Sequence, residues 1–138
     1  MNVLVDTPVW SLALRRHAGN LSQSEEKLAR SLADLIREGR AEVLGSIRQE
    51  VLSGIREETQ FNKIRKYLCP FQDPYLDVED YEEAAHMSNL CRRRGVSGSA
   101  IDFLICAVAH RRSWAVFSTD GDFRHFAAVL PLHLFTPV

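Results

Sequence analysis

Five acidic side chains stand at positions from which they could act on one substrate. They are far apart in the sequence: Asp6, Glu50, Asp102, Asp120 and Asp122. Carboxylates that are packed together repel one another, and a divalent cation is the simplest relief of that repulsion. Mg²⁺ and Mn²⁺ prefer oxygen ligands, activate water and polarise phosphodiesters. If the fold brings these acids together, they predict metal-assisted phosphoryl chemistry, of which hydrolysis is the simplest case.

The predicted elements place these acids at one edge of a sheet. Four short apolar runs predict strands, at residues 3–5, 42–44, 114–117 and 132–135. Helical patterns lie between them, so we expect one α/β domain over residues 1–138, with a mainly parallel sheet. Asp6 and Asp120 each follow a strand, and ligands in such folds bind beyond the carboxyl ends of the strands.

Capping residues mark where the helices begin. Thr7 is a predicted N-cap, followed by Pro8. Three sequences have the form of a capping box or resemble one, and they begin at Ser22, Ser46 and Ser99. The second opens the helix that contains Glu50, and the third gives Asp102 a structural role as its partner. Capping and metal binding are compatible, because a helix N-terminus favours a charged carboxylate.

Two of the later helices are each expected to bury one face. A helix is predicted over about residues 59–67, and the next runs from about Asp77 to Gly95. The inward face expected for this second helix consists of Tyr81, Ala84, Ala85, Ser88 and Cys91. The helix that follows Ser99 is expected to bury Ile101, Leu104, Ile105 and Val108.

Composition excludes several classes of protein. The chain has 138 residues, 46% hydrophobic and 25% charged, which fits one globular domain. No apolar run approaches the roughly 20 residues that span a bilayer. The first residues have no basic region and reach an acid at Asp6, so we expect no signal peptide and a cytosolic protein with no membrane partner. The three cysteines have neither disulfide nor zinc spacing. A net charge of −1 excludes binding of nucleic acid by bulk charge alone.

Each acid also has an ordinary structural interpretation. Asp6 and the Asp120–Asp122 segment are typical of turns, and Glu50 is compatible with an exposed helix position. The acid-rich stretch Asp73–Glu83 is interpreted as a solvated loop and helix start. His125 is more often structural than catalytic in such a position.

The arginines fall into two groups. Arg92–Arg94 and Arg111–Arg112 are interpreted as solvated helix C-termini, whose charge suits the helix dipole. Arg15, Arg16 and Arg56 follow Asp6 or Glu50 on predicted helices and are candidate contacts for phosphate or for a protein partner.

Four motifs together resemble the PIN-domain family, and within it the VapC-type toxin ribonucleases. They are Val5-Asp6-Thr7, Glu50-Val51-Leu52-Ser53-Gly54, the helix segment from Asp102 to Ala107, and the segment from Ser118 to Phe123. The resemblance covers essentially the whole chain. This sequence departs from the family pattern at Pro8, where Ser or Asn is common, and at Cys106, where Ala is usual.

This resemblance implies a three-layer sandwich and a metal-dependent endoribonuclease. Asp6, Glu50, Asp102 and Asp120 would bind Mg²⁺ or Mn²⁺ and activate water, with Asp122 as a supporting or alternate ligand. It also implies an RNA substrate, a homodimer and a cognate antitoxin that masks the acidic site.

Three other functions compete with this one. A two-component receiver domain needs a lysine after a late strand, but Lys27, Lys63 and Lys66 all lie in helical stretches. A phosphatase with a nucleophilic Asp needs a second acid two residues later, where this chain has Pro8. A catalytically silent PIN-like domain that only binds protein or RNA stays open, because the presence of the acids does not prove cleavage.

Overall fold

The computed structural model describes residues 1–16 and 18–138. In these residues the strands are β1 (Val3–Val5), β2 (Ala41–Glu42), β3 (Ala115–Phe117) and β4 (His133–Leu134). The helices are α1 (Thr7–Arg15), the 3₁₀ turn η1 (Ala18–Asn20), α2 (Gln23–Arg37), α3 (Gly45–Leu52), α4 (Glu58–Leu68), α5 (Val78–Arg93), α6 (Ala100–Arg112) and α7 (Asp122–Ala127).

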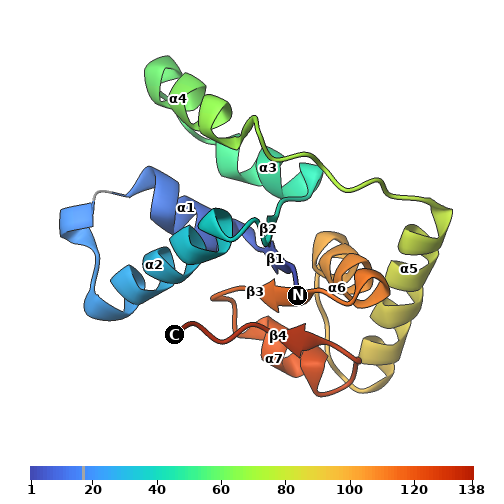
Figure 1. Cartoon of the computed structure of the whole chain (residues 1–138). Helices are drawn as coiled ribbons and strands as arrows, with labels where there is room; N and C mark the ends of the chain where they lie inside the picture. The colour runs from blue at the N-terminus through green and yellow to red at the C-terminus, as the bar shows by residue number, and fades with distance from the viewer. Residues whose placement is uncertain (17) are drawn as a thin grey trace.

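The sheet has the order β2-β1-β3-β4, and every pairing is parallel. Helices α1 and α2 lie on one side of it and α5 and α6 on the other, while α3 and α4 extend from the β2 edge (Figure 1). The predicted α/β sandwich with a short parallel sheet is therefore confirmed. Because all four strands point the same way, their carboxyl ends share one edge.

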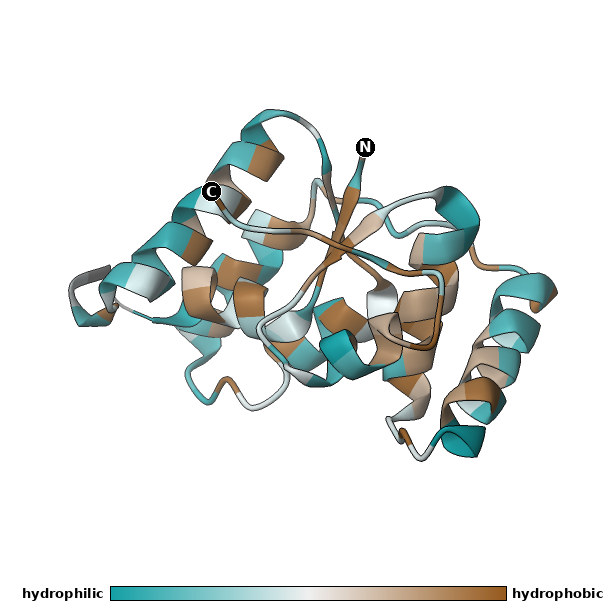
Figure 2. Cartoon of the chain, turned by 90° about the horizontal axis from the view of Figure 1, so that it is seen from below, coloured by the Kyte–Doolittle hydropathy of each residue, from teal (hydrophilic) through white to brown (hydrophobic). Residues whose placement is uncertain are grey.

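The core forms where the strands and the inner helix faces meet. All three β1 residues are fully buried, and Trp10 of α1 is buried beneath them with its indole N–H donating to the Val5 carbonyl at 3.0 Å. Figure 2 shows apolar residues concentrated on the central strands and on the helix faces turned towards them. No helix of the described residues is both long enough and apolar enough to cross a bilayer.

Several predicted boundaries need correction. The second strand is Ala41–Glu42, and Val43 and Leu44 are buried in the connection to α3. Helix α1 is capped by Asp6, whose side chain accepts from the Thr7 amide, so Thr7 is the first helical residue and not the cap. The predicted box at Ser46 does not form, because α3 already begins at Gly45. The boxes at Ser22 and Ser99 are confirmed.

The inward face predicted for α5 is only partly right. Ala84 and Cys91 are buried as expected, but Tyr81 and Ala85 are exposed and Ser88 is half-buried. The buried stripe consists of Asp80, Ala84, Met87 and Cys91. Ile105 and Val108 of α6 are also buried as expected, whereas Ile101 and Leu104 are half-buried. These more exposed residues of α5 and α6 line one shallow apolar surface hollow of about 360 Å³.

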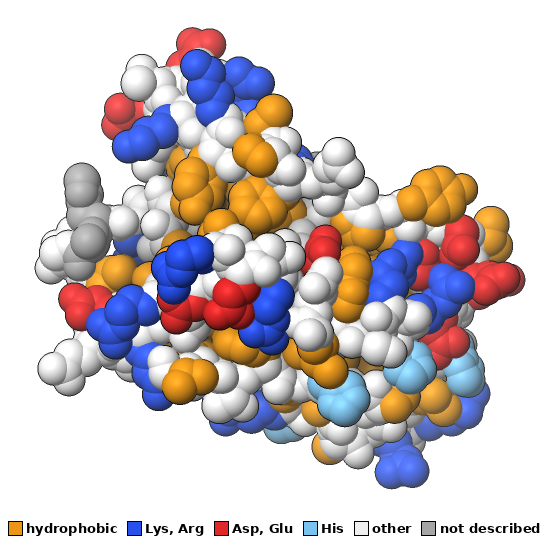
Figure 3. All heavy atoms as spheres, in the orientation of Figure 1, with side chains coloured by type: hydrophobic (Ala, Val, Ile, Leu, Met, Phe, Trp, Pro, Cys, Tyr) orange, Lys and Arg blue, Asp and Glu red, His pale blue; other side chains and the backbone are white. Residues whose placement is uncertain are grey.

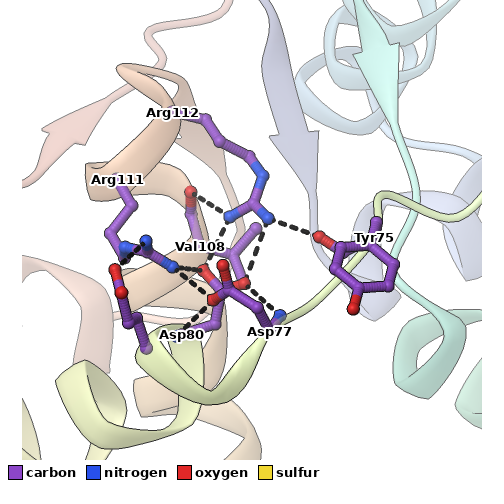
Figure 4. A network of polar contacts seen from close by, with 7 residues as sticks. Tyr75, Asp77, Asp80, Val108, Arg111 and Arg112 are labelled. Carbon is purple, nitrogen blue, oxygen red and sulfur yellow. Dashed lines mark hydrogen bonds and ion pairs between the residues drawn. The ribbon is translucent and has the colours of Figure 1, made fainter.

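The structure also corrects the interpretation of Arg111 and Arg112 as solvated. Arg111 bonds Asp77, Glu79 and Asp80, and Arg112 bonds Asp80 at 2.8 Å and the Tyr75 carbonyl at 2.6 Å (Figure 4). The side chain of Asp80 is fully buried, so the acid-rich stretch is not simply solvated. Acidic and basic side chains are intermixed over α5 on the surface (Figure 3). This network joins the start of α5 to the end of α6.

Candidate active site

Asp6 lies at the end of β1, at the centre of the predicted site. Its Oδ1 accepts from the Thr7 amide at 2.8 Å, and its Oδ2 accepts from the Ser118 hydroxyl at 2.7 Å. Burial raises the pKa of Asp6; the bonds from Ser118 and Thr7 oppose that rise, and the nearby charges of Asp102 and Glu50 add to it. Its side chain is therefore a buried carboxylate with the charges of two other carboxylates nearby, which is an environment that a cation would stabilise.

Thr7 connects this carboxylate to α3. Its hydroxyl donates to Glu50 Oε2 at 2.9 Å, across 43 positions of the sequence. Glu50 itself is exposed on the second turn of α3. The contact fixes one oxygen of Glu50 beside the end of β1 and leaves the other available to a ligand.

Ser118 makes the corresponding connection on the other side of Asp6. Besides donating to Asp6, its hydroxyl accepts from the Asp120 amide at 3.0 Å. Asp120 Oδ1 in turn accepts from the Asp122 amide at 2.9 Å, in the turn that opens α7. We refer to the resulting hydrogen-bonded series as the carboxylate network: Glu50, Thr7, Asp6, Ser118, Asp120 and Asp122.

Asp102 approaches the network from α6. Its Oδ2 accepts from the Ser99 amide at 3.1 Å, while its own amide donates to the Ser99 hydroxyl at 3.1 Å. The capping interpretation is thus correct, and the charge of Asp102 is nevertheless close enough to raise the pKa of Asp6. Cys106, one turn further along α6, is fully buried, and burial raises the pKa of its thiol, so it is not suited to be a nucleophile.

The donor set fits a hard divalent cation held partly through water. All candidate ligands are carboxylates, which suits Mg²⁺ or Mn²⁺. Within residues 1–16 and 18–138, however, no three His, Cys, Asp or Glu side chains are positioned to hold one ion directly. Mg²⁺ usually keeps several waters and binds through one or two carboxylates, so this ion would contact most of these acids through water.

Two members of the carboxylate network carry no charge, and neither was predicted as a site residue. Thr7 and Ser118 were noted only as parts of motifs, yet their hydroxyls make the bonds that connect Asp6 to Glu50 and to Asp120. A signal was available, since each hydroxyl residue directly follows a predicted strand end or its acid. Hydroxyl side chains beside clustered acids are typical positioning groups.

Comparison with known families identifies the domain in which this candidate site lies. A family model of the PIN domain matches residues 3–129. The chain belongs to the PIN-domain family. This confirms the family resemblance drawn from the four motifs. No curated protein sequence matches this PIN domain.

Solved structures share the fold of this PIN domain. FitAcB from Neisseria gonorrhoeae is 21% identical with a TM-score of 0.74, and the match covers 98% of this chain and 97% of that one. VapBC2 from Rickettsia felis, bound to a DNA fragment from its promoter, is 14% identical with a TM-score of 0.75 and covers 98% of both chains. A toxin–antitoxin complex from Klebsiella pneumoniae is 16% identical with a TM-score of 0.68, covering 99% and 98%. At these identities the likeness establishes the fold.

Proposed function

We propose that this PIN-domain protein is a metal-dependent endoribonuclease and the toxin of a toxin–antitoxin pair. The single observation that carries the proposal is the carboxylate network, which joins acids from three separate segments at the carboxyl edge of the sheet, with the charge of Asp102 close by. The neighbours of known structure include toxin–antitoxin complexes, which supports an antitoxin partner. An RNA substrate in turn favours a cytosolic location.

In the proposed reaction a water oxygen attacks the phosphorus of an RNA phosphodiester and the bond to the 3′ oxygen breaks. Mg²⁺ or Mn²⁺, when bound, would lower the pKa of water and polarise the phosphate. Asp6, Glu50, Asp102 and Asp120 would hold the ion directly or through bound water, with Asp122 in support, and Thr7 and Ser118 would orient these carboxylates. The nucleophile is water and not the ribose 2′-hydroxyl; the water loses a proton and the departing 3′ oxygen gains one, so the products are a 3′-hydroxyl and a 5′-phosphate.

We also propose that the protein forms a homodimer through α5 and α6. The hollow between these helices is lined mainly by apolar side chains, and Tyr81 remains 55% exposed beside it. Exposed apolar patches of this kind commonly mark protein–protein contacts.

The deciding experiment measures cleavage of a pool of structured RNAs by the antitoxin-free protein. Wild type is assayed with Mg²⁺, with Mn²⁺ and with chelator, alongside Asp102→Asn. Asparagine can still accept the Ser99 amide bond, so this variant should fold while losing the charge. Asp34→Asn, an exposed acid on α2, is the matched control.

We expect metal-dependent cutting by wild type and Asp34→Asn and a loss of at least roughly 100-fold in Asp102→Asn. Equal cutting by all three proteins would disprove the assigned role of Asp102. A wild type that binds Mn²⁺ and RNA but cuts nothing in the pool would favour the catalytically silent binding module.

A further inference from the structure

A surface hollow of about 770 Å³ lies at the amino edge of the sheet, opposite the carboxylate network. Its walls come from the end of α2, from β2, from the connection between α4 and α5, and from Trp114, which directly precedes β3. The described residues that line it include none of the five predicted site acids. We refer to it as the amino-edge hollow. A ligand bound there would not contact the carboxylate network.

Two arginines hold the α4–α5 connection, which forms one wall of the amino-edge hollow. Arg48 donates to the Leu68 carbonyl at 2.8 Å and pairs with Asp73 at 3.1 Å. Further along the connection, Arg112 donates to the Tyr75 carbonyl at 2.6 Å (Figure 4). Contacts within the chain therefore fix this wall, and a fixed wall lowers the cost of ordering a binding site.

Glu42 is the one charged lining residue without an ion pair in the described part of the chain. The other two, Asp73 and Arg112, are each paired with an opposite charge. Glu42 is half-buried, and its Oε1 accepts from the Asn2 side-chain amide at 2.8 Å. Burial raises the pKa of Glu42, and the bond from Asn2 opposes that rise. A partly desolvated carboxylate that is oriented but has no counter-charge is stabilised by a cation.

Aromatic side chains and two prolines also line the amino-edge hollow. The Phe71 ring is held by an edge-on contact with the Trp10 ring, at 5.3 Å between centroids. The guanidinium carbon of Arg112 lies 5.7 Å from the centre of the Trp114 ring. A guanidinium is planar and less strongly hydrated than an ammonium group, so it packs better against such surfaces. This lining therefore favours a guanidinium as the cation that pairs with Glu42.

We propose that the amino-edge hollow binds an arginine side chain of a protein partner. The guanidinium pairs with Glu42, and the aliphatic part of the side chain packs against Phe71 and Trp114. The volume of the hollow exceeds what one guanidinium needs, which leaves room for the residues that flank the arginine in a peptide chain. A nucleotide is disfavoured, because its phosphates would meet two acids and an arginine that is already paired. The inference does not depend on the proposed nuclease activity.

The test follows the two indole N–H signals of the ¹⁵N-labelled protein by NMR during titration with a capped pentapeptide that has one central arginine. Trp114 lines the hollow and reports on binding. Trp10 is the internal reference, because it is fully buried and its N–H donates to the Val5 carbonyl. Matched peptides replace the arginine by citrulline, which keeps the shape without the charge, or by lysine. Agmatine represents a small-molecule source of the same guanidinium.

Two variants test the assigned carboxylate. Glu42→Gln removes the charge, and its side-chain oxygen can still accept the Asn2 bond. Glu38→Gln is the matched control, because Glu38 is an exposed acid at the end of α2 that does not line the hollow. Thermal melting establishes that both variants fold.

We expect the arginine peptide to shift the Trp114 signal saturably and to leave the Trp10 signal in place. The citrulline peptide with wild type, and the arginine peptide with Glu42→Gln, should each bind roughly tenfold more weakly. The lysine peptide should bind about threefold more weakly, and Glu38→Gln should change the affinity by less than about twofold.

Four results would overturn the inference. The first is no shift of the Trp114 signal up to about 10 mM peptide. The second is equal affinity for the arginine and citrulline peptides, and the third is an equal loss in Glu42→Gln and Glu38→Gln. The fourth is tighter binding of agmatine than of the arginine peptide, which would identify the occupant as a small molecule and not a protein partner. If the expected pattern appears but no RNA is cut, the arginine site is correct and the proposed hydrolysis is wrong.

Discussion

At the scale of single residues, two uncharged hydroxyls connect the acids of the candidate site. Thr7 and Ser118 each join Asp6 to another acid, and both do so across more than 40 positions of the sequence. A carboxylate that is oriented in advance binds a cation more tightly than one that must first be ordered.

Thr7→Val removes the hydroxyl while keeping the shape of the side chain. We expect Mn²⁺ affinity, measured by calorimetric titration, to fall by about tenfold, because Glu50 loses its positioning bond. Thr7→Ser, which retains the hydroxyl, should bind Mn²⁺ nearly as wild type does. If Thr7→Val and Thr7→Ser had the same affinity, the contact with Glu50 would have no part in metal binding.

Local sequence indicated which acids to consider as candidate ligands, but it did not indicate the hydrogen bonds that connect them. Asp6 and Asp120 could be chosen because each follows a short apolar run, which local sequence reveals. The Ser118–Asp6 bond joins residues 112 positions apart, and no local pattern encodes such a partner. The same limit explains why the Arg111–Asp80 contact was missed, since its partners are 31 positions apart.

At the scale of elements, similar capping sequences gave different outcomes. Ser99 and Asp102 form the reciprocal bonds of a capping box, whereas Ser46 lies inside α3 and its hydroxyl is buried without a partner among the described residues. The chain enters α3 one residue earlier, at Gly45, so Ser46 is displaced from the capping position. Sequence patterns identify a helix start only to within a residue or two. A shift of one residue is enough to change which side chain occupies the capping position.

Alanine substitution should lower the stability at Ser99 but not at Ser46. Ser99→Ala removes an N-cap and should lower the free energy of unfolding by about 1 kcal/mol. Ser46→Ala removes an unpaired buried hydroxyl and should leave stability unchanged or raise it by up to about 1 kcal/mol. Urea denaturation measures both. A loss at Ser46 as large as that at Ser99 would mean that its hydroxyl has a partner.

The ion network between α5 and α6 should control the acid stability of the domain. The bond from Arg112 holds the pKa of Asp80 far below its ordinary value, despite the opposing effect of burial. Its stabilising contribution is therefore complete above about pH 4, where an unfolded aspartate is also ionised, and is lost as the pH falls from there towards the folded pKa.

Asp80→Asn tests this role. We expect its free energy of unfolding at pH 7 to fall by about 2–3 kcal/mol, slightly less than for a fully buried pair because Arg111 and Arg112 reach solvent. Between pH 4 and pH 2 wild type should lose stability more steeply than the variant. Asp34→Asn, which breaks an exposed pair with Arg37, should change stability by less than about 0.5 kcal/mol. If the stability of Asp80→Asn and of Asp34→Asn fell equally steeply with pH, the assigned role of Asp80 would be contradicted.

At the scale of the whole molecule, the sequence predicted the layers better than the surfaces. Alternating helix and strand patterns led to a parallel sheet covered on both sides, as observed. The pattern failed on α5, where Tyr81 and Ala85 were assigned to the core and instead line a surface hollow. Apolar residues that serve an interface have the same periodicity as core residues, so a single sequence does not distinguish them.

The proposed dimer gives a test at this scale. Ala85→Arg places a long charged side chain in the hollow between α5 and α6, at an exposed helical position that tolerates arginine. We expect analytical ultracentrifugation to show a monomer for this variant and a dimer for wild type. Glu82→Arg, an exposed neighbour that does not line the hollow, should remain dimeric. If both variants and wild type sediment alike, this face is not the dimer contact.

The position of β1 between β2 and β3 has a consequence for synthesis of the protein. Asp6 leaves the ribosome first, but its partner Ser118 belongs to a segment that is translated 112 residues later. The nascent chain therefore has no complete carboxylate network until β3 has emerged and paired with β1. For the proposed toxin, the complete site therefore exists only once β3 has been translated, which leaves time for the proposed antitoxin to be made first.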